Sequence, residues 1–410
     1  MRRRVLFVIP TLDRCGAEKQ MTLLAKGLPP DEFQPHVAVL TRLGPYKEDL
    51  EAAGVPISFI DKGHKISLSG YHRLKSLIRR FKPDVVHTWL FAANSYGRQA
   101  AFACKTPVVI CGERCVDPWK GALHGWIDAK LSKRTDAYIV NSSGIVDFYT
   151  GRGLPETKFH VIPNAVQTPP WVTPQERKEN KRRLLEELGL PLNSRRHKVT
   201  EKGLLFDQMD ITETTQASEE PYLIGLIARF WPQKRIEDAL WTADQLKFAL
   251  MNFYLIVIGD GPERERLLRY REDLQLKDRV IFLGEQSNTS RFMKAFDLVW
   301  NCSAYEGQSN SILEAMAHGV PVVASDIPGN RDLVVPNYNG SLIPEYDYDA
   351  TRRRTALSRE TLRLLNPSNS SLMESWSANA HAWTKENFSL DAMIERHVKL
   401  YRELLQKKGL

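Results

Sequence analysis

The chain has 410 residues, 42% of them hydrophobic and 26% charged, which fits a globular protein of about two domains. No stretch reaches the roughly 18 consecutive apolar residues of a membrane-spanning helix, so an integral membrane protein is not predicted. The net charge of +8 favours attraction to phosphorylated substrates or to an anionic membrane, unless it reflects only a basic surface.

The five cysteines are scattered and odd in number, which favours reduced thiols in a cytoplasmic protein. Cys111 and Cys115 have no second ligand pair nearby, so a zinc site is not expected. The basic N-terminus precedes an apolar run that is too short for a signal peptide, and we expect it to form the first strand.

Strand-like and helix-like segments alternate through the first 168 residues, as in a doubly wound parallel sheet. Strands are expected at residues 5–10, 37–40, 57–60, 84–87, 107–111 and 138–140. Such sheets bind ligands at the carboxyl ends of their strands. His87 is therefore a candidate cleft residue, with a buried structural histidine as the equal alternative. Gly16 opens the first helix, where a glycine allows a ligand close to the backbone or simply forms a tight turn.

Two basic segments follow in this half of the chain. Residues 71–81 have apolar positions at helical spacing and a cluster of lysine and arginine elsewhere. This is typical of a solvated amphipathic helix, and docking of the basic face on anionic lipid is the alternative. Residues 119–134 mix Trp119 and Trp126 with lysine and arginine, which suits a membrane interface, although packing of both tryptophans in the core is the simpler interpretation.

A charged helix is expected at 176–188, and residues 191–221 are polar and without periodicity. A structureless segment of this length is uncommon inside a compact domain, so we interpret it as an insertion.

The second half begins with a strand at 222–227 and a loop that carries Arg229 and Lys234. Two cations in a strand-to-helix loop suit a diphosphate, arginine through its planar fork and lysine as a point charge, unless both are simply solvated. Further strands are expected at 253–258, which ends at Gly259, and at 280–283, which ends at Leu283.

Residues 303–326 combine a polar loop, a short helix at 312–317 and a buried strand at 320–324. The first N–H groups of a helix attract anions, so Ser309, Asn310 and Ser311 are candidates for binding a phosphate. Gly307 would admit a ligand close to the backbone. The alternative is a capping box of Ser311 with Glu314, which needs no ligand.

Glu306 and Glu314, separated by seven residues and followed by A-M-A-x-G-x-P-V-V-A, resemble the signature of retaining glycosyltransferases of family 4. The resemblance implies an α/β protein of the GT-B fold, with two Rossmann-like doubly wound domains facing a cleft. The domains would be 1–168 and 169–389, with the helix at 390–410 packing back on the first and the insertion at 191–221 in the second.

The resemblance also implies roles. Arg229, Lys234 and the helix start at 309–311 would stabilise a departing diphosphate, while Glu306 would hold the donor sugar and Glu314 the ribose. Gly259 and the loop after Leu283 would line the nucleotide, and His87 joins the catalytic candidates.

The acceptor side would include Gly16, Glu113 and Arg114. Relatives often carry a second glycine before Gly16, and a histidine near Glu113 and Arg114. These departures leave the acceptor chemistry open, and Glu113 and Arg114 could also pair with each other.

The expected substrate is a UDP- or GDP-linked sugar, with no cofactor and no metal, and the expected acceptor is a glycan or lipid-linked molecule. Contact with an anionic membrane is a further expectation, at the inner face of the membrane of a cytoplasmic protein, and nucleic acid is not expected. A non-catalytic partner subunit of the same fold, or a GT-B epimerase or phosphorylase, are the alternatives.

Overall fold

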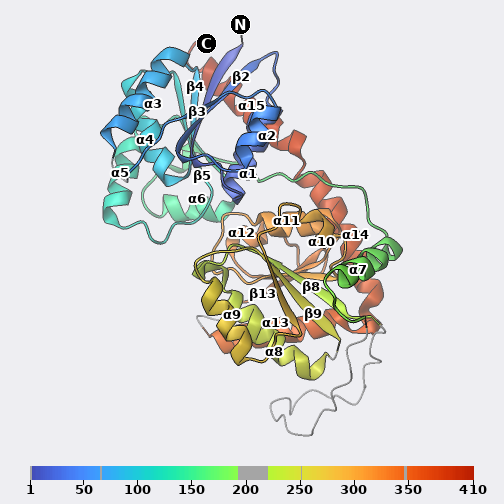
Figure 1. Ribbon diagram of the computed structural model, residues 1–410. Coiled ribbons are helices and arrows are strands. Elements are labelled where there is room, and N and C mark those ends of the chain that lie inside the picture. The colour runs from blue at the N-terminus through green and yellow to red at the C-terminus, as the bar shows by residue number, and fades with distance from the viewer. Residues whose placement is uncertain (1, 65–66, 193–219, 251, 346–348) are drawn as a thin grey trace. The chain divides into compact units, whose positions relative to one another are not determined.

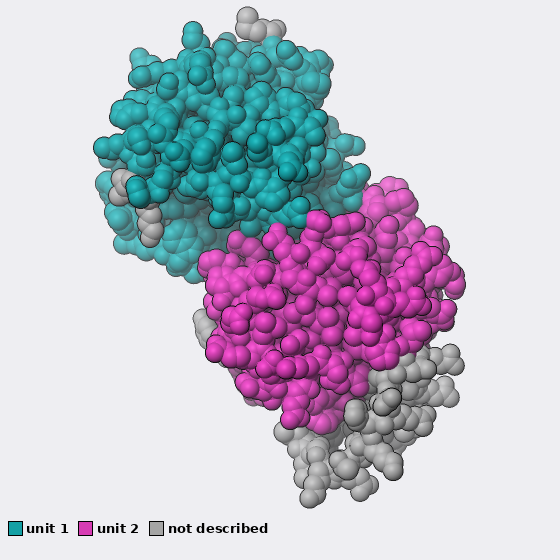
Figure 2. All heavy atoms as spheres, viewed as in Figure 1, with its two compact units in different colours: residues 1–167, 306–310, 387–410 teal, residues 168–305, 311–386 magenta. Residues whose placement is uncertain are grey.

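The computed structural model describes residues 2–64, 67–192, 220–250, 252–345 and 349–410. Within them the chain forms two compact units, coloured separately in Figure 2. Unit 1 comprises residues 1–167, 306–310 and 387–410, and unit 2 comprises residues 168–305 and 311–386. Most of the insertion expected at 191–221 lies outside the described residues.

Unit 1 is built on a seven-stranded sheet in the order β3-β2-β1-β4-β5-β6-β7, with every pair parallel. Its strands are β1 (Arg3–Thr11), β2 (Phe33–Arg42), β3 (Ile57–Phe59), β4 (Val85–Trp89), β5 (Val108–Glu113), β6 (Ala137–Val140) and β7 (Phe159–Val161). The central strands are buried on both faces, which explains continuous apolar runs such as that of residues 5–9.

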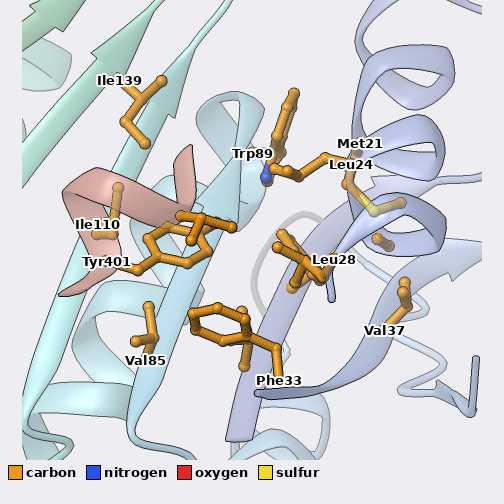
Figure 3. Close-up of a cluster of buried hydrophobic side chains, with 14 of the residues drawn as sticks. Met21, Leu24, Leu28, Phe33, Val37, Val85, Trp89, Ile110, Ile139 and Tyr401 are labelled. Carbon is orange, nitrogen blue, oxygen red and sulfur yellow. The ribbon is translucent and has the colours of Figure 1, made fainter. Parts of the chain in front are cut away.

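Helices cover both faces of this sheet (Figure 1). They are α1 (Gly16–Gly27), α2 (Tyr46–Ala52), α3 (Leu68–Phe81), α4 (Leu90–Ala103), α5 (Ala122–Ser132), α6 (Ser143–Thr150) and α15 (Leu390–Gln406). One face packs against α1 and α15, and the other packs against α3 and α4. Tyr401 of α15 reaches into the first of these cores beside Phe33, their rings 6.0 Å apart (Figure 3).

Unit 2 repeats this plan with a six-stranded parallel sheet in the order β10-β9-β8-β11-β12-β13. Its strands are β8 (Tyr222–Ile227), β9 (Phe253–Ile258), β10 (Val280–Gly284), β11 (Leu298–Asn301), β12 (Val322–Ser325) and β13 (Gly340–Ile343). Its helices are α7 (Pro174–Glu187), α8 (Ile236–Ala249), α9 (Arg264–Asp273), α10 (Ser290–Met293), α11 (Asn310–Ala317), α12 (Pro328–Arg331), α13 (Ala350–Leu365) and α14 (Ser370–Asn387).

The predicted fold class, two doubly wound α/β domains, is confirmed, whereas several predicted boundaries are wrong. Strand β4 continues to Trp89, so His87 lies in the middle of the strand and not at its end. Strand β5 includes Glu113. Helix α11 begins at Asn310, so Ser311 lies within the helix and cannot be the N-cap of a capping box. Among the described residues, no helix is long and apolar enough to cross a membrane.

Candidate functional site

Arg229 and Lys234 lie in the connection from β8 to α8, where the parallel strand delivers them to the carboxyl edge of the unit 2 sheet. Arg229 is exposed and its guanidinium lies 5.6 Å from the ring of Trp231. Lys234 is half-buried and ends a short 3-10 turn at residues 232–234. The loop therefore presents two cations on a backbone of defined shape.

Gly259 shapes this loop through a backbone contact. It follows β9 with φ of +136°, and a Cβ there would overlap the carbonyl oxygen of Ala228. The N–H of Phe230 donates to the carbonyl of Asp260 at 2.8 Å, and the N–H of Gly259 donates to that of Gly284. Only glycine lets the turn after β9 approach so closely, and this contact supports the backbone beside Arg229.

The cation loop is also joined to the strand end that precedes Glu306. The N–H of Ala304 donates to the carbonyl of Gln233 at 2.8 Å. Lys234 is thus one residue away from a backbone hydrogen bond to the segment after β11. Leu283, at the end of β10, is half-buried, and its carbonyl accepts from the Gln286 side chain at 2.9 Å.

Glu314 lies one turn into α11 and is half-buried. Its Oε2 accepts from the Thr289 hydroxyl at 3.1 Å, which orients the carboxylate, and its backbone carbonyl accepts from the amide of His318. Ser311 precedes it in the first turn, where helix N–H groups have no intrahelical partner and the dipole is positive. This arrangement suits an anion beside a polyhydroxyl group.

Residues 306–310 belong to unit 1, where side-chain amides hold them. The N–H of Asn164 donates to Gln308 Oε1 at 2.6 Å, and Asn164 Nδ2 donates to Asn310 Oδ1 at 2.9 Å. Gln20 Nε2 donates to the same Asn310 oxygen at 3.2 Å. Asn141 Nδ2 completes the amide network by donating to Asn164 Oδ1 at 3.1 Å.

Two candidate glycines lie against this segment. Asn310 Nδ2 donates to the carbonyl of Gly16 at 3.2 Å, and a Cβ on Gly16 would come within 2.8 Å of that nitrogen. A Cβ on Gly307 would overlap the carbonyl oxygen of Arg114. Glu306 is half-buried and Ser309 is buried. Unit 1 therefore brings Gly16, Gly307 and Asn310 together as predicted site residues.

His87 is not a cleft residue. Its side chain is 0% exposed in the core of unit 1, and its Nδ1 lies 2.8 Å from the Tyr401 hydroxyl on α15. Burial, then the nearby His397 and Arg114, hold the pKa of His87 well below its usual range. A neutral histidine at this depth packs the core.

Glu113 and Arg114 do not pair with each other. Glu113 is buried and its Oε1 lies 3.3 Å from Lys120 Nζ, in a network that includes Asp117 and Asp128. Burial raises the pKa of Glu113 although the Lys120 cation opposes this. The Arg114 guanidinium instead lies over the ring of Trp89, 3.9 Å from its centre.

The two tryptophans of residues 119–134 are on the surface, so their predicted packing in the core is wrong. Trp119 is 55% exposed and Trp126 is 60% exposed, and Lys130 lies over the Trp126 ring. A groove of about 380 Å³ runs among α3, α4 and α5, and Trp126 is part of its wall.

Sequence reasoning missed Gln20, Trp89 and Lys120. Gln20 contacts Asn310 and Trp89 contacts Arg114, both far apart in sequence, whereas Lys120 reaches back seven residues to Glu113. None of the three belongs to a recognised local motif. The helical spacing of Gln20 from Gly16 was the one available signal, since it places both on one side of α1. In the described part of the chain, no group of three or more histidine, cysteine or acidic side chains could hold a metal ion.

Two family models match the chain. The model described as Glycosyltransferase Family 4 matches residues 15–168, and the model described as Glycosyl transferases group 1 matches residues 207–379.

Curated relatives are similar over part of their length. A UDP-Gal:alpha-D-GlcNAc-diphosphoundecaprenol alpha-1,3-galactosyltransferase of Escherichia coli is 26% identical over 68% of this chain and 66% of its own length. An alpha-monoglucosyldiacylglycerol synthase of Streptococcus pneumoniae is 25% identical over 69% of this chain and 61% of its own. The chain thus spans less than two thirds of these relatives.

Solved structures are similar over nearly the whole chain. Anabaena Alr3699/HepE in complex with UDP and glucose has a TM-score of 0.79 at 19% identity, covering 98% of this chain and 100% of that chain. A sucrose-phosphate synthase from Thermosynechococcus elongatus has a TM-score of 0.74 at 16% identity, covering 99% and 100%. At these identities the likeness concerns the fold.

Proposed function

Because the chain belongs to the group 1 glycosyltransferases of family 4, we propose that it transfers a sugar from a nucleotide diphosphate sugar to an acceptor hydroxyl. The observation that carries this proposal is the backbone hydrogen bond between Gln233 and Ala304. It ties the loop with Arg229 and Lys234 to the strand end from which the glutamate signature begins.

The central demand of the reaction is stabilisation of the departing diphosphate, whose negative charge grows as the glycosidic bond breaks. Arg229 and Lys234 supply two positive charges, and the start of α11 adds N–H donors at Ser311. We assign Glu314 to the ribose hydroxyls and Glu306 to the donor sugar. These cations provide the charge stabilisation without a metal ion or a further cofactor.

We propose retention at the anomeric carbon, on the resemblance of the Glu306 to Glu314 segment to the retaining signature. A UDP-linked donor is the first choice, because a similar fold has been solved with UDP and glucose. Two relatives, whose names include a GlcNAc-diphosphoundecaprenol and a monoglucosyldiacylglycerol, support a lipid-linked or glycan acceptor.

A cytoplasmic location, with contact at an anionic membrane surface, completes the proposal. None of the described cysteines forms a disulfide, which suits a reducing compartment. Trp126, Leu123 and Lys130 on α5 provide apolar and cationic groups for the membrane contact.

The proposal is tested by titrating UDP, GDP, ADP and TDP into the protein by calorimetry without added metal. We expect one nucleotide to bind, and Lys234→Ala to weaken it at least tenfold, because a charge-assisted hydrogen bond contributes about 1.5–3 kcal/mol. Lys247→Ala on α8 is the matched control, because Lys247 pairs with Asp244 in the same unit. Equal nucleotide affinity in Lys234→Ala and the wild type would overturn the assignment of the donor site.

A further inference from the structure

Arg114 is a buried cation without an anionic partner. The residue is 8% exposed, and its guanidinium lies 3.9 Å from the centre of the Trp89 ring. Its Nε and Nη2 are covered and have no hydrogen-bond partner among the described residues. Arginine donates five hydrogen bonds in a rigid fork, so a buried and unsatisfied fork is uncommon and calls for a ligand.

The nearest acid in sequence is already engaged. Glu113 is held by Lys120 at 3.3 Å, and that cation also lies 3.1 Å from Asp117 and 3.6 Å from Asp128. Successive residues of an extended chain point to opposite sides, which separates Arg114 from this network. No carboxylate among the described residues forms an ion pair with Arg114.

Other polar atoms around Arg114 are also unsatisfied within the described structure. Trp89 Nε1, His87 Nε2 and His397 Nε2 are buried without partners. The His87 ring centre lies 5.0 Å from that of Trp89 and 6.0 Å from that of His397. His397 Nδ1 donates to the carbonyl of Met393 at 2.8 Å, so its Nε2 is an acceptor in the neutral ring.

Arg114 and Trp89 also lie at an edge of the sheet where ligands commonly bind. Trp89 is the last residue of β4, and Arg114 directly follows β5. The two strands are adjacent and parallel, with Trp89 in register with Gly112. Parallel α/β sheets bind ligands at this carboxyl edge.

We propose that Arg114, together with the indole N–H of Trp89, binds an oxyanion, phosphate or carboxylate, carried by the acceptor. The cation and the indole donate hydrogen bonds to the oxyanion, and the free Nε2 of His397 accepts one from a neighbouring hydroxyl. The substrate class is thus an acidic acceptor, such as a phosphorylated or uronic sugar. This identification of the acceptor rests on the proposed glycosyl transfer, whereas the anion site itself does not.

The test uses the full chain with its donor site saturated by UDP, so that added anions cannot bind there. Inorganic phosphate and sodium glucuronate are titrated by calorimetry, with glucose as the neutral comparison. We expect one of the two anions to bind and glucose not to bind. The anion that binds distinguishes a phosphate from a carboxylate as the recognised group.

Arg114→Gln keeps hydrogen-bonding capacity but removes the charge, and it should weaken the anion at least tenfold while UDP affinity stays the same. The anion affinity of Arg114→Lys should lie between those of Arg114→Gln and the wild type, because lysine keeps the charge but lacks the planar fork of arginine. Arg396→Gln, an exposed site on α15, is the control with the same change of charge. If Arg114→Gln fails to fold, Trp89→Phe keeps an aromatic ring but removes the indole N–H, and it should weaken binding of the anion.

The proposed anion site would be overturned if the wild type bound neither anion. It would also be overturned if the wild type and Arg114→Gln bound the anion with equal affinity. If UDP binds in such an experiment, the donor assignment survives this result. If none of UDP, GDP, ADP and TDP binds, the proposed function fails separately, and the anions can then be titrated without a nucleotide.

Discussion

His397 illustrates how much a single buried group can influence stability. It is 1% exposed on α15, and burial, together with the Arg114 cation, lowers its pKa to about 3. In the unfolded chain its pKa returns to about 6.5. The unfolded state therefore binds a proton between these values that the folded state does not, and stability is lost as the pH falls below about 6.5.

We predict that His397 alone lowers the free energy of unfolding by about 2 kcal/mol between pH 7.5 and pH 5.0. His87, whose pKa is also lowered, adds to the effect. His397→Leu removes the titrating ring, so urea unfolding of this variant should depend less on pH by that amount. If His397→Leu and the wild type lost the same stability between pH 7.5 and pH 5.0, His397 would not be the source of the pH dependence.

At the scale of a secondary-structure element, the side chain of Arg177 attaches α7 to the body of unit 2. Its Nη1 donates to the carbonyls of Met293 and Phe296, both at 3.1 Å. Its Nη2 donates to those of His318 and Gly319, at 2.8 and 3.1 Å. Two of these carbonyls follow α11, so one side chain satisfies the C-terminal end of the helix that bears Glu314.

We predict that Arg177→Ala lowers the free energy of unfolding of unit 2 by about 2–4 kcal/mol, because partly buried carbonyls lose their donor. Urea denaturation measures the loss. Arg183→Ala, at an exposed position on the same helix, should change it by about 0.5 kcal/mol or less. Similar effects of both substitutions would indicate that helix propensity, and not the capping, is responsible.

The elements themselves were largely predictable because their signals are local. Apolar runs marked the buried strands, and helical spacing marked α3 and α15. The errors have non-local causes. Polar residues His87 and Thr88 continue β4 because α4 and the much later α15 bury them, and the sequence around them carries no sign of that cover.

In the candidate site, too, local patterns were predictable and contacts between distant side chains were not. Arg229 and Lys234 were found because they lie in one loop, and the glutamate spacing is a local pattern. The partner of Glu113 was missed because Lys120 returns to it from the loop before α5, and Trp89 was missed because its role depends on a neighbouring strand. Side-chain pairing across loops is decided by packing, which spacing alone does not encode.

At the scale of the whole molecule, the charge of +8 and the surface of α5 predict binding to anionic vesicles. Leu123 and Trp126 are 67% and 60% exposed beside Lys130. Flotation with vesicles containing phosphatidylglycerol should recover the protein, and 0.5 M salt should release most of it. Leu123→Ala with Trp126→Ala should reduce recovery several-fold, because apolar burial in the interface is lost.

Phe248→Ala removes an equally exposed ring from unit 2 and should leave the recovery unchanged. Flotation that is indifferent to lipid charge and salt would count against the membrane contact.

The division of the chain has a consequence for its evolution and engineering. Unit 1 is assembled from three separate stretches, and α15, from the far end of the sequence, buries Tyr401 in its core. A chimera made by a single crossover near residue 168 would join the first 167 residues to an α15 from another protein. The apolar side chains of that helix would then have to pack in a core whose other residues come from this chain. Exchange of unit 1 between relatives therefore requires at least two crossovers, so that the first stretch and its last helix are inherited together.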